Sequence, residues 1–481
     1  GTVTNSERRI SRVRAAVAAP GQSRPDWAIV VDLAQRLQPL LPSRASLPDL
    51  FPYRQPEAIW NEHRQSTQGR DLDITGLSYA VLEREGPQQW PMPQGAAHGK
   101  ARLYVDGIFP TPDGRARFVD TPYKPVAEAR DARYPFVLNT GRLRDQWHGM
   151  SRTGTLGRLF GHVPEPALLM HPQDLARRLI GDGDLVQVRS RRGAILVPVQ
   201  ASTEVAMGQV FLAMHWGQEA LSGVASDGSA LTGVNALTTA AYCPVSRQPE
   251  LKHAAVRIAR AELPWSLLAM AWIPQGQALD TLQALRALMP QFAFASCVPF
   301  ASPSSLTDNA AARDGVLLRC AAAEPPPGAV LAQIESILGL CQADVLRYAD
   351  ARRGQRRAMR LVRGADRTRL DAFLLAGDTR AESWVRTVLL DQLDARSYGR
   401  LLLLPGAQPP VAVAARGKAV CSCFDVAQSR IENQLAQCTG SASQRLESLQ
   451  GALQCGTNCG SCLPELKRLV QVSMHAAAAI A

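Results

Sequence analysis

The cysteines near the C-terminal end constrain this chain more than any other feature of its sequence. Six of the ten cysteines in its 481 residues lie beyond residue 420: Cys421, Cys423, Cys438, Cys455, Cys459 and Cys462. Clustering of this kind indicates either a metal site or a disulfide scaffold. The remaining four are scattered singly, which is typical of small buried side chains: Cys243, Cys297, Cys320 and Cys341.

The spacing of the clustered cysteines favours iron–sulfur chemistry. Cys421 and Cys423 are separated by one residue, and Cys459 and Cys462 by two, so the four thiolates can converge on one centre. Glycines beside them let backbone N–H groups turn toward sulfur and offset the negative charge of a thiolate-ligated cluster. A [2Fe–2S] cluster uses four cysteines. A structural zinc ion also uses four, usually in two Cys-x2-4-Cys pairs, and disulfides follow no spacing rule, so both remain alternatives.

Apolar residues recur with helical spacing around these cysteines. Ala427, Ile431 and Leu435 form one stripe. Residues 446, 449 and 453 form a second stripe, with Ser443 expected as the N-cap. A third helix is expected to carry a proline in its first turn, where the missing N–H costs nothing. The cysteines therefore belong to a small, mostly helical domain.

The cysteine segment also resembles a known family. Cys421-Ser-Cys423-Phe424, the intervening helices and Cys459-Gly-Ser-Cys462-Leu-Pro-Glu465 are similar to the small [2Fe–2S] domain of bacterioferritin-associated ferredoxin, which is appended to some nitrite and nitrate reductases. The resemblance covers roughly residues 418–475 and implies four cluster ligands: Cys421, Cys423, Cys459 and Cys462. The gap between the two pairs is a few residues longer than in the free ferredoxin, so Cys455 is an alternative ligand.

Residues 131–260 predict a β-barrel or sandwich. Short apolar segments at 136–138, 185–188, 195–199 and 210–214 are separated by turn residues. Several polar and basic side chains follow these segments. Hydroxyl groups and a glycine turn can bind phosphate, basic side chains can meet phosphate or ring oxygens, and an asparagine can bond to a ring edge.

Four motifs in this region occur in the order of a known family: Thr140-Gly141-Arg142, Trp147-His148 through Ser151 to Thr153, Gly233 to Thr238, and Pro249 to His253. They resemble the C-terminal molybdopterin-dinucleotide-binding domain of the dimethyl-sulfoxide-reductase superfamily, with the closest likeness to bacterial assimilatory nitrate reductase catalytic subunits. The resemblance implies a six-stranded β-barrel and the following cofactor-binding residues: Thr140, Gly141, Arg142, Trp147, His148, Ser151, Thr153, Asn235 and Lys252. The segment after the third motif departs from the family, which usually has an acid where this chain reads Ala241-Tyr242-Cys243-Pro244.

The first part of the chain extends the resemblance. Residues 1–9, 25–27 and 109–114 are similar to stretches inside the same catalytic subunits. The resemblance implies that the [4Fe–4S] cysteines, the molybdenum ligand and most of the substrate pocket would precede Gly1. We therefore expect no catalytic residue in this chain, and we expect the chain alone to reduce no nitrate. Locally, the sequence predicts a helix over residues 27–41 and a hairpin around the turn at 111–114.

Charge and hydropathy exclude two further classes of protein. The net charge is +11, but aromatics make up only 6% of the residues and are not interleaved with the basic ones, which argues against nucleic-acid binding. No apolar run approaches the roughly 20 residues that a membrane span needs. Arginine is dense at Arg352, Arg353, Arg356 and Arg357. This stretch is either an ordinary solvated surface or a docking face for an acidic protein partner.

The sequence thus predicts a multidomain α/β and β chain. Its expected domains are a molybdopterin oxidoreductase core remnant (1–130), a pterin-dinucleotide-binding β-barrel (131–260), a small α/β linker domain of unknown role (264–415) and a helical [2Fe–2S] domain (418–481). Within the linker domain, strands are expected at 370–375 and 401–404 and a helix at 379–393.

The resemblance implies a cytoplasmic oxidoreductase that converts nitrate to nitrite. Its cofactors would be the [2Fe–2S] cluster, molybdenum on bis-molybdopterin guanine dinucleotide shared with the upstream part, and an upstream [4Fe–4S] cluster. Electrons would come from ferredoxin, flavodoxin or a flavoprotein subunit, with no nucleic acid and no membrane involved. Two alternatives remain: another molybdopterin oxidoreductase such as a formate dehydrogenase, and a non-catalytic [2Fe–2S] electron carrier.

Overall fold

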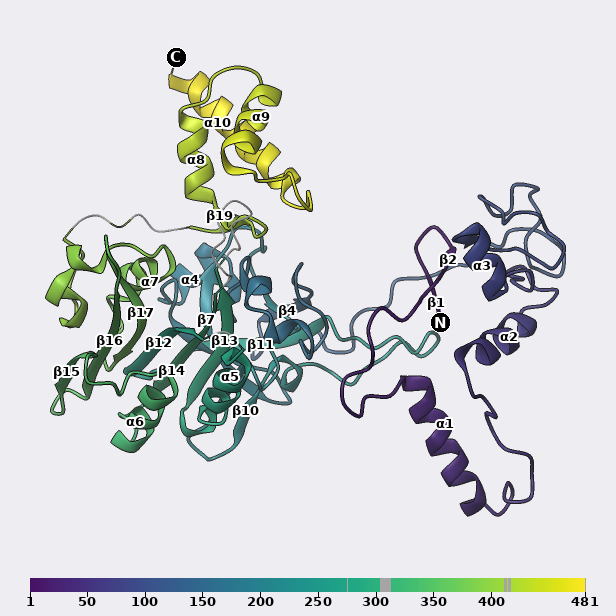
Figure 1. The fold of residues 1–481 in the computed structure, drawn as a ribbon, viewed down its shortest axis with the longest axis horizontal. Coiled ribbons are helices and arrows are strands. Elements are labelled where there is room, and N and C mark those ends of the chain that lie inside the picture. The colour runs from purple at the N-terminus through teal and green to yellow at the C-terminus, as the bar shows by residue number, and fades with distance from the viewer. Residues whose placement is uncertain (275, 303–312, 411–412, 414–416, 481) are drawn as a thin grey trace. The chain divides into compact units, whose positions relative to one another are not determined.

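The computed structural model describes residues 1–274, 276–302, 313–410, 413 and 417–480. These residues form two units, Gly1–Tyr123 and Lys124–Ala481, which Figure 1 shows as ribbons. Each unit has its own buried apolar core. The second unit contains the barrel, the linker domain and the cysteine domain.

The first unit combines a small sheet with helices. Its strands pair in the order β1-β2-β3, and its elements are β1 (Thr2–Thr4), β2 (Arg9–Arg12), α1 (Asp26–Leu37), α2 (Pro56–Ser66), α3 (Tyr79–Glu85) and β3 (Gln88–Gln89). Its buried core is small: Ile10, Trp60, Ile74, Leu77, Tyr79, Leu82 and Met92. The Trp60 indole N–H donates to the carbonyl of Leu77 at 2.6 Å, which ties α2 to this core.

Local predictions in the first unit have mixed outcomes. The helix expected over 27–41 is present as α1 and ends where Gln38 begins a 3-10 turn before Leu41. The hairpin expected around 111–114 is wrong. The turn itself forms, with Gly114 N–H donating to Thr111 O at 3.0 Å. No strand follows it in this fully described unit, because a strand needs a ladder partner and Phe118 projects entirely into solvent.

The second unit contains the expected six-stranded closed barrel. Its strands pair in the order β11-β4-β8-β5-β7-β6: β4 (Phe136–Gly141), β5 (Leu168–Met170), β6 (Leu185–Arg189), β7 (Ala194–Ala201), β8 (Gln209–Ala213) and β11 (His253–Arg260). Alternate residues of β4 are buried, as the strand period of two requires. The short helix α4 (Pro172–Arg177) follows β5.

The linker domain is built on an eight-stranded sheet in the order β10-β9-β13-β14-β12-β17-β16-β15. Its elements are β9 (Leu221–Val224), β10 (Ala230–Thr232), β12 (Trp265–Ile273), α5 (Ala278–Arg286), β13 (Phe294–Ala301), β14 (Asp314–Ala322), α6 (Gly328–Ile337), β15 (Leu346–Asp350), β16 (Gln355–Arg363), β17 (Thr368–Ala376) and α7 (Glu382–Leu390). Strands β12, β13, β14 and β17 with the two intervening helices have the split βαβ, ferredoxin-like topology. Strands β9 and β10 join this sheet although they lie between barrel strands in the sequence.

Helices cover both faces of this sheet (Figure 1). Side chains of α5 and α6 belong to one apolar cluster, and those of α7 belong to the cluster that includes the barrel core. The strand expected at 370–375 is present as β17. The strand expected at 401–404 is wrong: the segment lies in a 3-10 helix, Gly399–Leu403, because β12 and β16 already occupy both edges of β17.

A buried ion network joins the barrel to the linker sheet. Glu165, in the loop before β5, pairs with Arg319 of β14 at 2.7 Å and with Arg386 of α7 at 2.6 Å. Burial raises the pKa of the Glu165 carboxyl, but the two guanidinium groups outweigh it and lower the pKa to about 2. The carboxylate is therefore charged and compensated at neutral pH.

The cysteine domain is small and mostly helical, as the sequence predicts. It contains β18 (Ala419–Cys421), β19 (Val426–Ala427), α8 (Gln428–Ala436), α9 (Ala442–Leu453) and α10 (Leu463–Ile480). The N-cap of α9 is Ser441 rather than Ser443, because Ser441 forms a capping box in which Gln444 closes the first turn. Among the described residues, no helix has the length and apolar character needed to cross a bilayer.

Candidate functional site

The predicted cluster ligands come together in two pairs at the start of the cysteine domain. The Sγ atoms of Cys423 and Cys459 lie 3.4 Å apart. Cys421, at the end of β18, forms a thiol contact with Cys462 at the start of α10. The two inner thiols, Cys421 and Cys462, are buried, and Cys459 is exposed. The fold therefore joins the two halves of the sequence motif.

The thiols differ in how readily they lose a proton. Hydrogen bonds from the Ser461 hydroxyl and backbone lower the pKa of Cys459 to about 7. Burial raises the pKa of Cys462 to about 12. A buried thiolate at Cys462 thus requires a nearby positive charge, and a bound metal supplies one while releasing the proton.

The donor set fits a two-iron cluster better than a single ion. Among the residues that the structure describes, no three His, Cys, Asp or Glu side chains converge closely enough to hold one metal ion. A [2Fe–2S] cluster needs only two thiolates at each iron, which matches the pairwise contacts of Cys423 with Cys459 and of Cys421 with Cys462.

The two remaining cysteines of this domain differ in position. Cys455 lies fully buried beside Cys421, so it stays a substitute ligand. Burial raises the pKa of its thiol to about 11. Cys438 lies away from the pairs, where its thiol contacts Gln434 O and the Ser448 hydroxyl, both at 3.1 Å.

On the barrel, the loop after β4 gathers three of the predicted pterin-binding side chains. The Arg142 guanidinium lies 4.8 Å from the centre of the Trp147 ring, and Arg142 Nη2 lies 3.5 Å from His148 Nε2. The rings of Trp147 and His148 meet edge to face at 4.6 Å. Trp147 is 55% exposed, so a flat aromatic surface beside a cation is open to a planar ring and its phosphates.

His215, which the sequence analysis did not identify, forms two hydrogen bonds with the backbone of this loop. Its Nε2 accepts a hydrogen bond from Leu143 N–H at 3.0 Å, and its Nδ1–H donates to His148 O at 2.6 Å. Burial lowers the pKa of His215, in keeping with the neutral tautomer that these two bonds require. The bond to His148 O supports a residue whose φ of 43° is uncommon outside glycine. In the sequence, His215 is a single histidine before Trp216, and this pattern alone does not predict its bonds to the loop.

The other predicted pterin-binding residues lie near the loop or are already bonded. The Thr140 hydroxyl donates to Leu251 O at 2.8 Å, and the Thr153 hydroxyl accepts from Trp147 N–H at 3.2 Å, so both tie the backbone together. The remaining predicted residues are Gly141 at the end of β4, exposed Ser151, exposed Asn235 in a 3-10 turn, and exposed Lys252 before β11.

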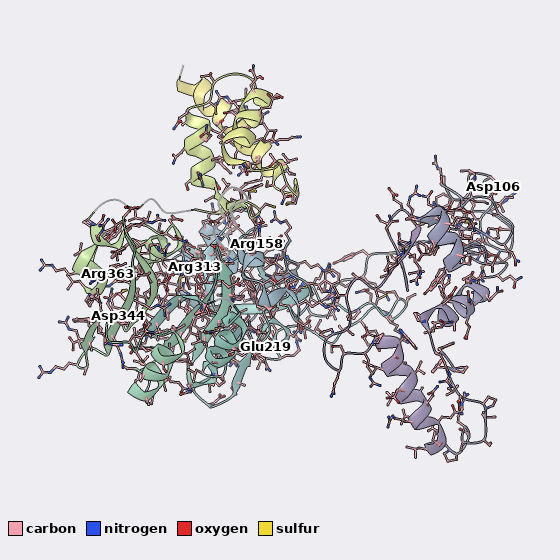
Figure 2. All side chains as sticks on the ribbon, in the orientation of Figure 1. Asp106, Arg158, Glu219, Arg313, Asp344 and Arg363 are labelled. Atoms are coloured by element: carbon pink, nitrogen blue, oxygen red, sulfur yellow. The ribbon has the colours of Figure 1, made fainter. Side chains whose placement is uncertain are left out.

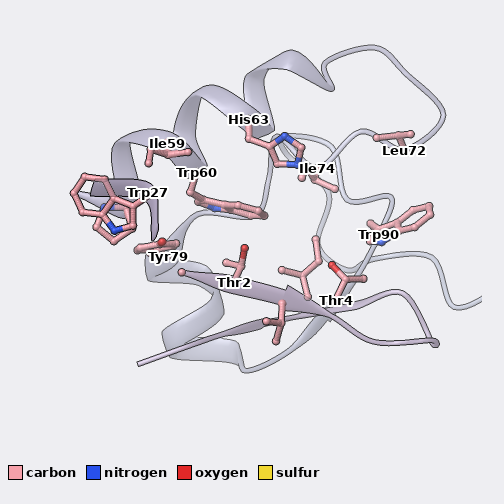
Figure 3. Close-up of a pocket in the computed structure, with 14 residues that line it drawn as sticks. Thr2, Thr4, Trp27, Ile59, Trp60, His63, Leu72, Ile74, Tyr79 and Trp90 are labelled. Carbon is pink, nitrogen blue, oxygen red and sulfur yellow. The ribbon is translucent and has the colours of Figure 1, made fainter. Parts of the chain in front are cut away.

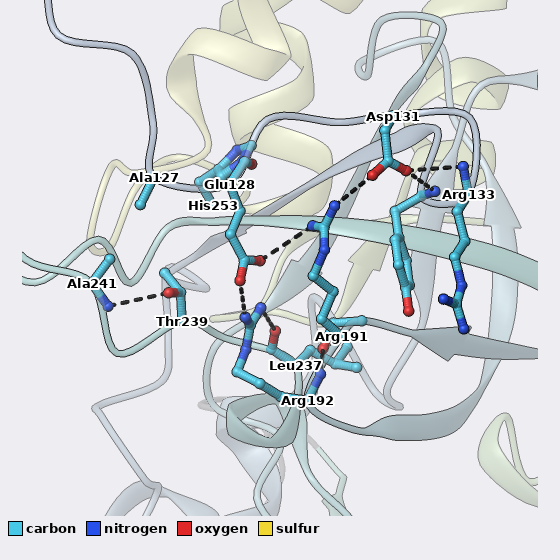
Figure 4. Close-up of polar contacts among 12 residues, drawn as sticks. Ala127, Glu128, Asp131, Arg133, Arg191, Arg192, Leu237, Thr239, Ala241 and His253 are labelled. Carbon is cyan, nitrogen blue, oxygen red and sulfur yellow. Dashed lines mark hydrogen bonds and ion pairs between the residues drawn. The ribbon is translucent and has the colours of Figure 1, made fainter.

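A network of ion pairs supports the barrel next to Lys252 (Figure 4). Glu128 pairs with Arg191 and Arg192 in the β6–β7 turn, and its carbonyl accepts from His253 Nε2 at 2.8 Å. Asp131 pairs with Arg191 as well. These contacts fix the start of β11 relative to the adjacent β6–β7 turn.

The first unit contains an open apolar groove of about 630 Å³ (Figure 3). Figure 3 shows Trp27, Trp60, Ile59, Ile74 and Trp90 around it, with His63 above. The groove has no cluster of charged or nucleophilic groups, so its lining suits an apolar occupant.

The arginine-dense stretch is only partly available to a partner. Arg352 and Arg353 are exposed in the β15–β16 turn, at the edge of the sheet. Asp344 and Arg363, which Figure 2 labels, lie at the other end of the same two edge strands. Arg356 is bound to the buried Glu335 at 2.6 Å. The Arg357 side chain is fully buried and donates to Asp378 O at 3.1 Å. Two of the four arginines therefore stabilise the fold.

Comparison with family models agrees with both sites. Residues 136–255 match the model described as the molydopterin dinucleotide binding domain. Residues 419–471 match the BFD-like [2Fe-2S] binding domain. The chain therefore carries a pterin-dinucleotide-binding domain and a [2Fe–2S]-binding domain.

Similar proteins extend the comparison along the chain. Over 98% of its length the chain is 31% identical to a nitrate reductase of Klebsiella oxytoca, of which the match covers 49%. It is 32% identical to the assimilatory nitrate reductase catalytic subunit of Bacillus subtilis over 54% of this chain and 34% of that protein. It is 33% identical to the F420-dependent formate dehydrogenase subunit alpha of Methanocaldococcus jannaschii over 54% of this chain and 35% of that protein. The chain spans about half the length of the first of these relatives.

Proposed function

We propose that this chain, which carries a molybdopterin dinucleotide-binding domain and a BFD-like [2Fe–2S] domain, works as part of a molybdenum-dependent assimilatory nitrate reductase. The observation that carries the proposal is the similarity to a protein named nitrate reductase over 98% of the chain. That match includes the cysteine domain, whereas the match to the formate dehydrogenase subunit covers 54% of the chain.

Each domain has a distinct role in this proposal. The 142–153 loop would hold a pterin dinucleotide, with Arg142 meeting phosphate or ring oxygens and Trp147 stacking on a ring. Molybdenum held by two such dinucleotides would supply the oxygen-atom chemistry that converts nitrate to nitrite. Asn235 and Lys252 are exposed and free to add hydrogen bonds to the same ligand.

The cysteine domain would be the electron-entry module. Its ligands would be Cys421, Cys423, Cys459 and Cys462, in the pairs that the fold brings together. The donor would be a ferredoxin, a flavodoxin or a flavoprotein subunit, in the cytoplasm. Exposed Arg352 and Arg353 offer an acidic donor a positive contact, while Arg356 and Arg357 are engaged within the fold.

A formate dehydrogenase is the second candidate, because one similar protein carries that name. Activity with nitrate or with formate distinguishes the two candidate functions. An enzyme in which this chain is joined to the part of its relatives that the match does not cover is tested with nitrate and reduced methyl viologen, and with formate and an acceptor dye. We expect nitrate reduction and no formate oxidation. We also expect the 481 residues alone to reduce no nitrate, and robust activity of the isolated chain contradicts this.

Cofactor content tests the cysteine domain directly. Anaerobically purified chain is expected to contain two irons and two acid-labile sulfides and to give an S = 1/2 signal after dithionite reduction. Zinc without sulfide would show that the domain is a structural zinc module. Oxidised pterin, released by acid and detected by its fluorescence, tests the barrel separately.

Serine substitutions test the ligand set. Cys462→Ser is expected to abolish cluster binding, because it removes one thiolate of a buried pair. Cys438→Ser is the matched control and is expected to keep both irons, since its thiol contacts only Gln434 and Ser448. Cys455→Ser is also expected to keep both irons. Loss of iron in Cys455→Ser would mean that Cys455 replaces one of the four predicted ligands.

A further inference from the structure

The cysteine domain meets the barrel through the two residues that flank Cys421. His162 Nε2–H donates to Val420 O at 3.1 Å, and Arg144 Nη2 donates to the Ser422 hydroxyl at 2.9 Å. Gly161 also lies against this segment, since a Cβ added there would lie 3.4 Å from Ser422 Cβ. Both barrel side chains thus contact the loop that carries Cys421 and Cys423.

Asp145 fixes these two side chains in place. Its carboxylate accepts hydrogen bonds from Arg144 Nε at 2.9 Å and Nη2 at 3.0 Å, and it lies 2.6 Å from His162 Nδ1. The carboxylate is 19% exposed, so the group is shielded from part of the solvent screening that weakens surface pairs. We call Arg144, Asp145 and His162 the barrel dock.

Two of the three dock residues, Arg144 and Asp145, lie on the same loop as the predicted pterin-binding side chains. They come two and three residues after Arg142 and shortly before Trp147. His215 binds this loop at Leu143 and at His148, on both sides of the dock residues. One clamped loop therefore carries predicted pterin contacts and also contacts the segment that carries cluster ligands.

We propose that the barrel dock seats the [2Fe–2S] domain against the pterin-binding loop and that the Arg144 guanidinium sets part of the cluster's reduction potential. The inference rests on the proposed function, because it requires a bound cluster. Reduction adds one negative charge to such a cluster, and a nearby cation stabilises the reduced form. The Arg144 guanidinium of the Arg144–Asp145 pair bonds directly to Ser422, the residue between the predicted ligands Cys421 and Cys423.

The ion pair between Lys418 and Glu204, with 3.5 Å between Nζ and Oε1, is a second contact of the same two domains. This pair and the His162–Val420 hydrogen bond do not involve Arg144, so substitution of Arg144 removes neither of them.

The test is a redox titration of the cluster in the 481-residue chain, followed by EPR. Arg144→Gln removes the cation, leaves Asp145 with His162 as its remaining partner and is expected to shift the reduction equilibrium on the order of tenfold toward the oxidised form, which is ~59 mV for a one-electron couple. Asp145→Asn removes the opposing charge and is expected to shift it the other way. Arg144→Lys keeps the positive charge and is expected to restore most of the wild-type potential. Arg260→Gln is the matched control, because it breaks another barrel Arg–carboxylate pair, with Asp184 at 3.4 Å.

Opposite signs for the first two variants separate an electrostatic role from simple loosening of the domain contact, which would shift both in one direction. An unchanged potential in Arg144→Gln with two irons bound overturns the inference, and so do shifts of the same sign. A wild-type chain without iron and sulfide contradicts the proposed function itself and removes this inference with it. A bound cluster whose reduction potential is the same in the wild type and in Arg144→Gln contradicts this inference and leaves the proposed function unaffected.

Discussion

The two units of this chain bury their apolar residues to very different degrees. In the first unit, α1 exposes most of its apolar stripe: Leu33 is 56% and Leu40 just beyond the helix is 74% exposed. In the second unit, Leu138 of the barrel and Phe373 of the linker sheet are fully buried within continuous clusters. The amphipathic pattern of α1 thus predicts a helix, but burial of its apolar side chains depends on whether other elements pack against them.

The largest expected effect concerns the ion network of the second unit. Glu165→Ala leaves Arg319 and Arg386 buried without their shared carboxylate, and we expect a loss of ~3–5 kcal/mol in unfolding free energy. Urea unfolding, with peptide-resolved hydrogen exchange to separate the units, measures it. Stability of the first unit is expected to stay unchanged.

Glu219→Ala is the control for this change, because Glu219 is an exposed partner of Arg286 at 3.6 Å and such pairs contribute ~0–1 kcal/mol. A loss below ~1 kcal/mol in Glu165→Ala would mean that the two layers of the second unit do not depend on this carboxylate. Burial of apolar side chains would then be the main remaining difference between the two units.

Matched leucine substitutions test the comparison itself. Leu138→Ala creates a cavity in the barrel core and is expected to cost ~2–5 kcal/mol. Leu33→Ala removes an exposed side chain and is expected to change stability by less than ~0.5 kcal/mol. The same unfolding experiment measures both. A cost above ~1 kcal/mol for Leu33→Ala would show that the α1 stripe is covered in solution, which breaks the contrast between the units.

The smallest expected effect is the pH dependence that His215 gives to the second unit. Because burial lowers its pKa, the unfolded chain takes up a proton at His215 at a higher pH than the folded one does. The stabilisation is therefore complete above the ordinary histidine pKa of ~6.5 and is lost progressively as the pH falls below it. His215→Gln is expected to flatten this part of the profile between pH 7 and pH 5.

His475→Gln, which changes an exposed histidine, is expected to leave the profile as it is. Equal slopes in the wild type and in His215→Gln would mean that His215 does not clamp the loop in its neutral form. The loop contacts of Arg142 and Trp147 would then need another source of rigidity.

Local patterns predicted part of the secondary structure. Strand periodicity indicated β4, β6, β7 and β8, and helical spacing indicated α8 and α9. The failures share one physical cause. Residues 401–404 and the segment around the turn at 111–114 have strand-like composition, but a strand exists only where a partner offers a free edge, and sequence periodicity carries no information about that edge.

The candidate sites divide in the same way. The cysteine spacing favoured an iron–sulfur centre, because residue type and separation along the chain limit how thiolates can converge, and the choice of four ligands came from the family resemblance and stays a prediction. The role of His215 was not predictable, since it depends on β8 ending beneath a loop that starts more than seventy residues earlier. The burial of Arg357 was equally hidden, because charge density in a sequence does not reveal which face a side chain occupies.

By itself, the sequence determined which elements form and which chemistry the cysteines and the pterin motifs can carry, because propensity, spacing and residue type act over short distances along the chain. Only the tertiary structure decided that β9 and β10 join the linker sheet, that Glu165 is compensated by two distant arginines, and that Arg144 reaches the cluster loop. These contacts join residues that are far apart in sequence, and their energies arise only when folding removes both partners from water.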